Sequence, residues 1–443
     1  MNKSRRVAVV GSGISGAASA WLLRDACDVS LFEQEARFGG HTHTVSVDEG
    51  DRSLRIDTGF MVYNRPNYPL LSALFDHLSV ASYPTDMSFA ASFDGGRLEY
   101  AGTDLNGLFG QRRNLLQRDF WRLLSDILRF NRVAGQALRS PPADDECLAD
   151  FLDRHAFGDG FRQHYLYPMA AAIWSSPSAR IAHFPALSFL RFFANHGLIR
   201  LADRPQWLTV EGGSRAYLDR LLDDLGGRAR VAARVVSVER RREGATLVFA
   251  DGQRAQFDDV ILACHSDQAL ALLASPTAEE RDVVGAISYQ PNRVLLHTDP
   301  ALMPKQRRVW SSWNYLREGT SADDPVSVTY WMNSLQRLAT RRDYFVSLNP
   351  VREPAAASIV GEYHYEHPVF DAGALRAQRQ LHRIQGRERT WFAGAWTGYG
   401  FHEDGMRSAV EVAAALGARV PWLEQAKSSR ALSMIPTLAG QPA

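Results

Sequence analysis

The sequence predicts an α/β fold in which a Rossmann-like parallel sheet is interrupted along the chain by a second, α+β domain. Three observations predict it. A glycine-rich turn lies between an apolar strand and a helix near the N-terminus, which is the local order of a Rossmann-like domain. Further runs with the character of buried strands recur far along the chain. The length of 443 residues also exceeds that of one ordinary domain.

The first strand and its turn carry the most specific motif. Residues 7–10 are a valine-rich apolar run, and a helix-forming run from Ala17 to Leu23 follows the turn. In this context the first glycine permits a tight turn, the second leaves room for a pyrophosphate, and the third lets the helix pack closely on the strand. Free N–H groups at the helix N-terminus favour phosphate. The expected cofactor contacts here are Gly11, Ser12, Gly13, Ile14, Ser15 and Gly16.

The second strand, residues 29–32, ends in an acid. The carboxylate of Glu33 is suited to accept hydrogen bonds from an adenosine ribose and disfavours a 2′-phosphate, which leaves FAD or NAD as the cofactor. We expect Glu33 and its neighbour Gln34 to contact that cofactor. The pair Gly39 and Gly40 lets the chain pass close to the pyrophosphate, and His41 follows directly.

Two later regions are predicted to complete the same domain. Residues 231–238 and 245–249 predict a small β-meander, and residues 259–264 predict a buried strand. Residues 390–396 predict a strand that ends in glycine, and the glycine-rich turn 398–406 leads into a helix. We therefore expect the domain boundaries to be as follows: a discontinuous cofactor domain over residues 1–75, 205–275 and 385–425, a substrate domain over 76–204 and 276–384, and a flexible tail over 426–443.

The intervening segments predict a mixed sheet capped by helices. Residues 88–100 are typical of a hairpin around Asp94-Gly95-Gly96. Residues 326–333 and 344–348 predict strands, and residues 111–140 and 144–200 are predicted to be largely helical.

The glycine pair, the meander and the late glycine-rich turn together resemble the amine oxidase, phytoene desaturase and protoporphyrinogen oxidase group of flavoproteins. The resemblance implies a fold of the GR2, two-dinucleotide-binding type with FAD as cofactor. The sequence has no second strand–GxGxxG–helix unit for a nicotinamide, and no cysteine near the late turn. We therefore expect FAD to be held non-covalently and reoxidised by oxygen, a quinone or another carrier. Further cofactor contacts implied by the resemblance are Thr58, Gly59, Val235, Gly394, Ala395, Gly405 and Met406. In one departure, Ala395 and Trp396 stand where amine oxidases carry an acid.

Longer aromatic-rich segments resemble a narrower group, the predicted NAD/FAD-binding oxidoreductases associated with cyclopropane-fatty-acyl-phospholipid synthases. The matching segments are residues 57–60, 172–175, 195–198, 207–214, 312–315, 329–333, 365–368 and 400–405. The resemblance implies a lipid or fatty acyl substrate and a cyclopropane-fatty-acyl synthase as a candidate partner.

Dehydrogenation of a saturated C–C bond requires the carbon to lie against flavin N5, water to be excluded, and a group to take a proton. Histidine has a suitable pKa, and His402 and Glu403 lie in the turn expected to be nearest to the cofactor. We also expect catalytic roles for His196 and Tyr330. An ordinary structural role is the alternative for each of these residues and for the further candidates His41, His43, His364, Trp174, Trp313, Tyr315 and Trp331.

The favoured function is therefore a desaturase or dehydrogenase that acts on the fatty acyl chains of phospholipids by hydride transfer to FAD. Three alternatives remain open. They are an FAD-dependent fatty-acid double-bond isomerase, an amine oxidase, and a flavin-binding accessory subunit of a lipid-modifying enzyme.

Composition narrows the class of protein. The formal net charge of +1 provides no global field for nucleic acid, so no nucleic-acid partner is expected. Three widely separated cysteines predict neither a disulfide framework nor a metal site. No apolar run is long enough to span a membrane, so we expect a cytoplasmic protein. The arginine-punctuated apolar segment 112–132 fits either a solvated helix face or peripheral contact with the inner face of a membrane.

Overall fold

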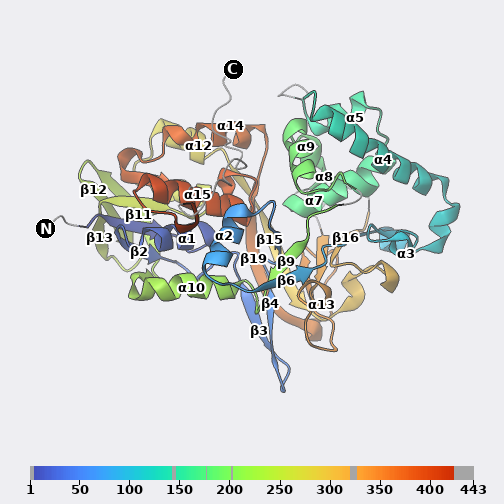
Figure 1. Cartoon of the computed structure of the whole chain (residues 1–443), viewed down its shortest axis with the longest axis horizontal. Helices are drawn as coiled ribbons and strands as arrows, with labels where there is room; N and C mark the ends of the chain where they lie inside the picture. The colour runs from blue at the N-terminus through green and yellow to red at the C-terminus, as the bar shows by residue number, and fades with distance from the viewer. Residues whose placement is uncertain (1–3, 142–145, 176, 201–202, 320–326, 424–443) are drawn as a thin grey trace.

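The computed structural model describes residues 4–141, 146–175, 177–200, 203–319 and 327–423, so the expected tail 426–443 lies outside the described residues. The molecule has two lobes (Figure 1). One lobe holds the N-terminal strand and is called the nucleotide lobe here. The other, the substrate lobe, ends in a group of helices. The long strands β15 (Ser288–His297) and β19 (Ile359–Val369) run between them.

The nucleotide lobe is built on a five-stranded sheet whose neighbouring strands are all parallel. In spatial order its strands are β10 (Ala229–Arg230), β2 (Asp28–Phe32), β1 (Arg6–Val10), β14 (Asp259–Leu262) and β20 (Thr390–Phe392). Val7, Ala8 and Val9 are fully buried, as expected for a parallel strand covered on both faces. Three distant parts of the chain thus form one sheet, and the expected Rossmann-like domain is confirmed.

Small residues set the spacing of the helices on this sheet. Helix α1 (Ile14–Leu23) packs against α15 (His402–Ala415). A Cβ atom on Gly405 would lie 2.8 Å from the side chains of both Ile14 and Ser15, so a glycine is needed where the two helices meet. Two further helices, α2 (Pro69–His77) and α10 (Arg215–Leu225), pack against α15 and α1 respectively.

The predicted meander is an antiparallel sheet of three strands, β11 (Val235–Arg241), β12 (Gly244–Phe249) and β13 (Arg254–Phe257). Arg240 on β11 forms a buried ion pair with Glu280 on α12 (Ala278–Val284), which in turn packs on α14 (Ala372–Gln380). Helices α12 and α14 therefore lie with the nucleotide lobe (Figure 1), although their sequences fall inside the expected substrate domain 276–384. The boundary differs because this long-range ion pair has no local sequence signal.

The substrate lobe contains a seven-stranded mixed sheet. In spatial order its strands are β19, β15, β18 (Phe345–Leu348), β17 (Ser327–Trp331), β16 (Trp313–Arg317), β7 (Phe89–Phe93) and β8 (Leu98–Ala101). Strands β7 and β8 form the expected hairpin. The run predicted as a strand over 326–333 ends earlier, because the chain turns into α13 (Met332–Leu335). The two longest strands of this sheet, β15 and β19, were not predicted.

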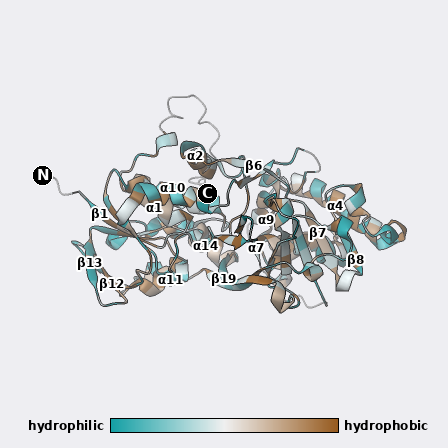
Figure 2. Cartoon of the chain, turned by 90° about the horizontal axis from the view of Figure 1, so that it is seen from below, coloured by the Kyte–Doolittle hydropathy of each residue, from teal (hydrophilic) through white to brown (hydrophobic). Residues whose placement is uncertain are grey.

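Helices cover this sheet, and all of them except α3 lie within the segments 111–140 and 144–200 that were predicted to be largely helical. They are α3 (Leu105–Leu108), α4 (Arg118–Ala137), α5 (Leu148–Arg154), α6 (Asp159–Phe161), α7 (Tyr167–Trp174), α8 (Ser178–Ala182) and α9 (Ala186–Asn195). Apolar and polar residues alternate along these helices (Figure 2), and in the longest of them, α4, Phe120, Leu123, Phe130 and Ala134 are buried. Within the described ranges, no helix is both long and apolar enough to cross a membrane.

The remaining strands connect the lobes. Strands β3 (Thr44–Asp48) and β4 (Ser53–Asp57) form a hairpin. Strand β9 (Trp207–Val210) pairs on its two sides with β5 (Tyr63–Asn64) and β6 (Ser82–Thr85). This short sheet holds the segment after β4 beside the nucleotide lobe.

Candidate functional site

A cavity of about 730 Å³ is lined by residues of both lobes. Glu33 and Val235 line one part, and Trp174, Trp313 and Tyr330 line another. We call these parts the nucleotide end and the aromatic end. The volume lies within the range usual for cofactor and ligand sites.

The glycine-rich turn leaves an open gap at the nucleotide end. A Cβ atom on Gly13 would meet no atom within 4 Å, and a Cβ atom on Gly40 would lie 3.5 Å from the Cα atom of Gly13. Gly13 is the N-cap of α1, and no side chain caps that helix. Gly11 has a φ of +99°, which only glycine adopts readily. Open space beside Gly13, in front of an uncapped helix N-terminus, fits a pyrophosphate.

Glu33 stands at the carboxyl end of β2 and lines the same part of the cavity. Its carboxylate accepts hydrogen bonds from the backbone N–H of Ser12 at 3.0 Å and from that of Glu35 at 3.0 Å. The hydroxyl of Ser12 also donates to it, at 2.5 Å. These bonds hold the carboxylate at the position expected for ribose recognition.

Most of the predicted cofactor residues line the cavity. They are Gly11, Ser12, Gly13, Ile14, Ser15, Glu33, Gln34, Gly39, Gly40, His41, Gly59, Val235, Gly394 and Ala395.

Four others do not line it: Gly16, Thr58, Gly405 and Met406. A Cβ atom on Gly16 would lie 1.9 Å from the carbonyl oxygen of Gly11, so this glycine serves helix packing. The hydroxyl of Thr58 lies 2.8 Å from that of Tyr365. Gly405 meets α1, and Met406 is fully buried in the core.

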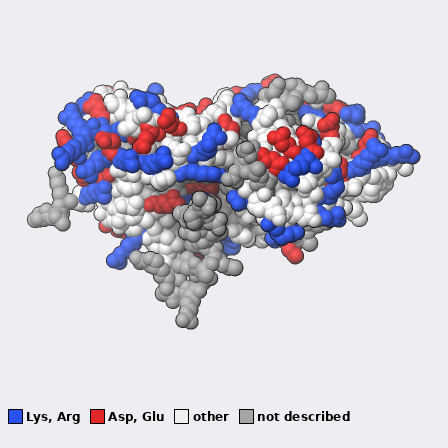
Figure 3. Space-filling model, turned by 90° about the horizontal axis from the view of Figure 1, so that it is seen from above, with Lys and Arg blue, Asp and Glu red and all other residues white. Residues whose placement is uncertain are grey.

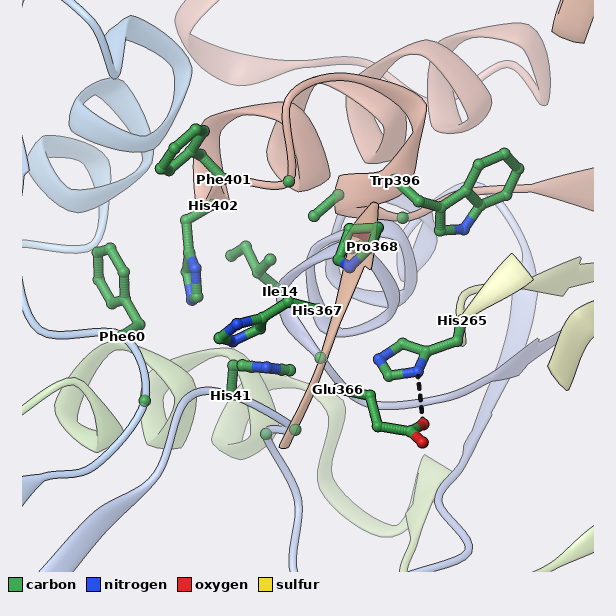
Figure 4. Close-up of a pocket in the computed structure, with 18 of the residues that line it drawn as sticks. Ile14, His41, Phe60, His265, Glu366, His367, Pro368, Trp396, Phe401 and His402 are labelled. Atoms are coloured by element: carbon green, nitrogen blue, oxygen red, sulfur yellow. Dashed lines mark ion pairs between the residues drawn. The ribbon is translucent and has the colours of Figure 1, made fainter. Parts of the chain in front are cut away.

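Four histidines line the middle of the cavity: His41, His265, His367 and His402 (Figure 4). The rings of His41 and His367 have centroids 5.3 Å apart, and those of His41 and His265 are 6.4 Å apart. His265 stacks on Tyr289 and pairs with Glu366, with Nδ1 3.5 Å from the carboxylate. Only His41 and His402 were predicted. His367 and Glu366 lie in the motif of residues 365–368, which was assigned no role.

Burial keeps these imidazoles neutral. It lowers the pKa of His367 to about 4 and that of His402 to about 3, and it lowers the pKa of His41 well below its usual value. Neighbouring imidazoles lower the pKa of His41 further. At neutral pH the cluster therefore offers hydrogen-bond donors and acceptors rather than positive charge.

A chain of amide hydrogen bonds sets the tautomer of His367. The backbone N–H of Arg293 donates to the side-chain oxygen of Asn349, whose amide group must then donate to the side-chain oxygen of Asn292. The Nδ2 group of Asn292 is thereby a donor, and it lies 3.3 Å from Nδ1 of His367. Nδ1 accepts this hydrogen bond, so the neutral ring carries its proton on Nε2.

His196 has the opposite polarity. Its Nδ1 lies 3.0 Å from the carbonyl oxygen of Phe192, which can only accept, so Nδ1 carries the proton and Nε2 is an acceptor. The ring stacks on Phe192 and lines the aromatic end. Burial lowers its pKa to about 4.

The adjacent residues His402 and Glu403 lie in different surroundings. His402 lines the cavity, stacks on Phe60 and has Nε2 3.2 Å from the hydroxyl of Thr42. Glu403 does not line the cavity, because its carboxylate accepts the backbone N–H groups of Leu70 and Leu71, each at 3.0 Å, at the N-terminus of α2. The structure thus gives Glu403 a helix-capping position in place of the expected catalytic one.

Asp404 also binds backbone, accepting from the N–H groups of Tyr399 and Phe401. Like Glu403, it does not line the cavity. Neither Glu403 nor Asp404 therefore replaces the acid that amine oxidases carry at the position of Ala395 and Trp396.

The aromatic end is apolar. Tyr330 lines it, its ring lies parallel to that of Trp313 with centroids 6.3 Å apart, and burial raises its pKa to about 12, so its hydroxyl stays protonated. Its other lining residues include Met87, Ile173, Trp174, Phe192, Leu198, Trp207, Phe370 and Phe401. Among the described lining residues, the charged ones are Glu33, Glu35 and Arg234 at the nucleotide end and Glu366, whose side chain is 46% exposed beside His265.

The other candidates named from the sequence lie elsewhere. Tyr315, Trp331, His43 and His364 do not line the cavity. The indole N–H of Trp331 donates to Asp343. His364 is exposed on β19, near Glu362.

Comparison with known proteins identifies the class of the site. Residues 14–417 match the family of flavin-containing amine oxidoreductases. The chain belongs to this family. Membership confirms the predicted class, an FAD-dependent oxidoreductase of the amine oxidase type, and the open space at Gly13, in a cavity that Glu33 also lines, fits that cofactor.

Several known proteins are distantly similar to the chain. A coproporphyrinogen III oxidase of Mycobacterium leprae is 27% identical over 293 residues, which cover 61% of this chain and 62% of that protein. The match thus spans less than two thirds of that relative. Two solved structures share the fold. A putrescine oxidase with redesigned cofactor binding has a TM-score of 0.66 at 18% identity, covering 94% of this chain and 99% of that one. A fatty acid isomerase from P. acnes has a TM-score of 0.65 at 14% identity, covering 94% and 100%.

Proposed function

We propose that this oxidoreductase acts on the apolar acyl chain of a fatty acid or lipid, as a desaturase or dehydrogenase. The observation that carries the proposal is the aromatic end, which the described lining residues form without lysine, arginine or a buried carboxylate. A buried ionised group is costly unless it is paired. An uncharged hydrocarbon chain is the ligand that this apolar lining binds with the smallest desolvation cost.

The same observation disfavours charged substrates. A cationic amine would need a carboxylate at the aromatic end, whereas Glu366 lies beside His265 with its side chain 46% exposed. Aromatic faces stabilise a desolvated cation by about 2 kcal/mol, which is less than the several kcal/mol that burial of an ammonium ion costs. A polyanionic substrate would need basic side chains, but the basic lining residue Arg234 lies at the nucleotide end.

The side chains of the site supply positioning, exclusion of water and proton handling. Bound FAD supplies a two-electron acceptor at its flavin N5. Trp174, Trp313 and Tyr330 exclude water from the bound acyl chain. Nε2 of His196 is the acceptor for the proton that leaves the carbon neighbouring the oxidised one, and Nε2–H of His367 is a fixed donor.

One accepting and one donating imidazole line the same cavity, which also supports a second candidate, double-bond isomerisation without net oxidation. Such a reaction takes a proton from one carbon and returns one to another, which requires both polarities in one site. An accessory role without turnover, with a cyclopropane-fatty-acyl synthase as partner, is an outcome of the following test.

The test is an anaerobic absorbance spectrum of the FAD-loaded protein with phospholipids that carry saturated, unsaturated, methyl-branched or cyclopropane chains. Lasting loss of the oxidised flavin absorbance with an acyl chain supports a desaturase. A changed double bond without lasting loss supports an isomerase. Loss of the oxidised flavin absorbance with amines but with no lipid overturns the proposal. If neither the absorbance nor any lipid changes, the accessory role is supported.

A further inference from the structure

We propose that the tip of the substrate lobe, formed by α3, the turn after it and α4 up to Arg132, docks on an anionic lipid bilayer. The proposal deepens the proposed function and rests on it for the choice of lipid as partner. This tip lies at the end of the molecule farthest from the nucleotide-binding sheet (Figure 1).

The tip concentrates the exposed apolar surface of the protein. Among the described residues, eight large hydrophobic side chains are exposed, and five of them lie between residues 105 and 128. Leu116 is 89% exposed and Leu105 is 74% exposed, whereas the three outside the tip are valines exposed by at most 43%. The five are Leu105, Leu115, Leu116, Trp121 and Leu128. A gathering of this kind on a soluble lobe is typical of a contact surface.

The backbone under these side chains is anchored, so they project outward. Asn114 is buried and donates to the carbonyl oxygen of Glu99, which holds the turn against β8. The indole N–H of Trp121 donates to the carbonyl oxygen of Leu115. The side chain of Leu116 is therefore presented to solvent by a held turn.

Arginines surround this apolar surface. Residues 104–132 contain six arginines and three aspartates, in a chain whose total net charge is only +1. Arg118 and Arg132 form no hydrogen bond or ion pair with any described residue, and Arg122 has only an exposed pair with Asp119 at 3.3 Å. Figure 3 shows basic side chains at the extreme end of the substrate lobe, whereas acidic and basic side chains are interleaved over the rest of both lobes. Exposed leucine and tryptophan among unpaired arginines match the headgroup region of an anionic bilayer in both polarity and charge.

The surface is connected to the site through one helix contact. Helix α4 packs on α9, and Phe192 of α9, together with His196 directly after it, lines the aromatic end of the cavity. Docking at the tip would thus hold the helices that line the acyl site close to the bilayer, whose phospholipids supply the acyl chains.

The test is sedimentation of the full-length, FAD-loaded protein with vesicles of phosphatidylcholine alone or mixed with phosphatidylglycerol. We expect binding to the mixed vesicles, weakening as salt is raised. R118Q combined with R122Q should lower vesicle binding by about 25-fold, at roughly fivefold for each charge. L116S should lower it by about tenfold. The matched control, V236S with R241Q, changes an exposed valine and an exposed arginine on β11 in the other lobe and should bind as the wild type does.

Equal binding by the control and tip variants, or no binding of the wild type to mixed vesicles at low salt, would overturn the proposal. The proposal would also be overturned if the wild type did not bind vesicles but bound another protein, and the tip variants lost that protein binding. The tip variants should reduce their flavin normally with a soluble short-chain acyl substrate in the absence of vesicles. If no acyl chain reduced the flavin or was converted, the proposed function would be wrong but the membrane proposal would stand, because vesicle binding is measured without turnover.

Discussion

The side-chain amide of Asn292 lies 3.3 Å from Nδ1 of His367, and its polarity is set by a backbone N–H two hydrogen bonds away. The buried imidazole is therefore held in one tautomer, with Nε2–H as its free donor. Two asparagines that do not line the cavity thus determine what the histidine offers to it.

Reversing the polarity of Asn292 tests this relationship. In N292D the new carboxylate accepts a hydrogen bond from Nδ1, so Nε2 loses its proton and the pKa of His367 rises toward the neutral range. We expect the rate of flavin reduction to fall by about 10- to 100-fold, with a shifted pH profile and unchanged FAD content. The measurement is stopped-flow absorbance between pH 6 and 9. H367Q, which keeps an N–H donor, should retain more activity than H367F. A wild-type pH profile in N292D would contradict the assigned tautomer.

His196 is expected to act as the proton acceptor through Nε2. H196F removes the acceptor but keeps a ring of similar shape against Phe192. Flavin reduction by the acyl substrate should slow by roughly 10²- to 10⁴-fold, the usual range for loss of a general base. FAD affinity, measured by fluorescence titration, should not change. An unaltered rate of reduction would assign the proton transfer to another group.

Glu403 should make stability depend on pH. Burial raises its pKa from the usual 4.5 to about 7, so the folded protein binds this proton more tightly than the unfolded chain does. The free energy of unfolding from this group is therefore largest below pH 4.5 and falls as the pH rises toward 7, by on the order of 3 kcal/mol in total.

Urea unfolding of the wild type and E403Q between pH 5 and 8 measures this effect. The glutamine can still accept a hydrogen bond at the start of α2 but cannot ionise. The difference between the two proteins should shift in favour of E403Q as the pH rises. A difference that does not vary with pH would show that the carboxyl group titrates normally.

Two glycines of the phosphate turn should respond differently to a side chain. Gly13 has a φ of −61° and open space at its Cβ position, so G13V should fold with stability within about 0.5 kcal/mol of the wild type while its side chain fills the gap expected for the pyrophosphate. Gly16 has no such space, because its Cβ atom would lie 1.9 Å from a carbonyl oxygen. G16V should therefore lose the fold. FAD titration with thermal unfolding of both variants checks this, and normal FAD binding by G13V would contradict the assignment.

The nucleotide end could be predicted because its constraints are local. The strand, three glycines, helix, second strand and Glu33 lie within the first 33 residues, and each is demanded by backbone geometry that neighbouring residues alone determine. The meander and the late strand at residues 390–392 were predicted for the same reason, since buried parallel strands and tight turns have recognisable composition.

The centre of the site could not be predicted in this way. His265 follows β14 and His367 lies near the end of β19, and only the pairing of long strands and the packing of two lobes bring them beside His41. His402 and Glu403 look equivalent in the sequence, yet one turns to the cavity and the other to α2, because successive residues of a helix point about 100° apart. The sequence by itself thus determined the kind of cofactor and the turn that holds it. Which side chains meet the substrate was decided by tertiary packing, because contacts between distant segments depend on strand register and helix orientation that no local pattern specifies.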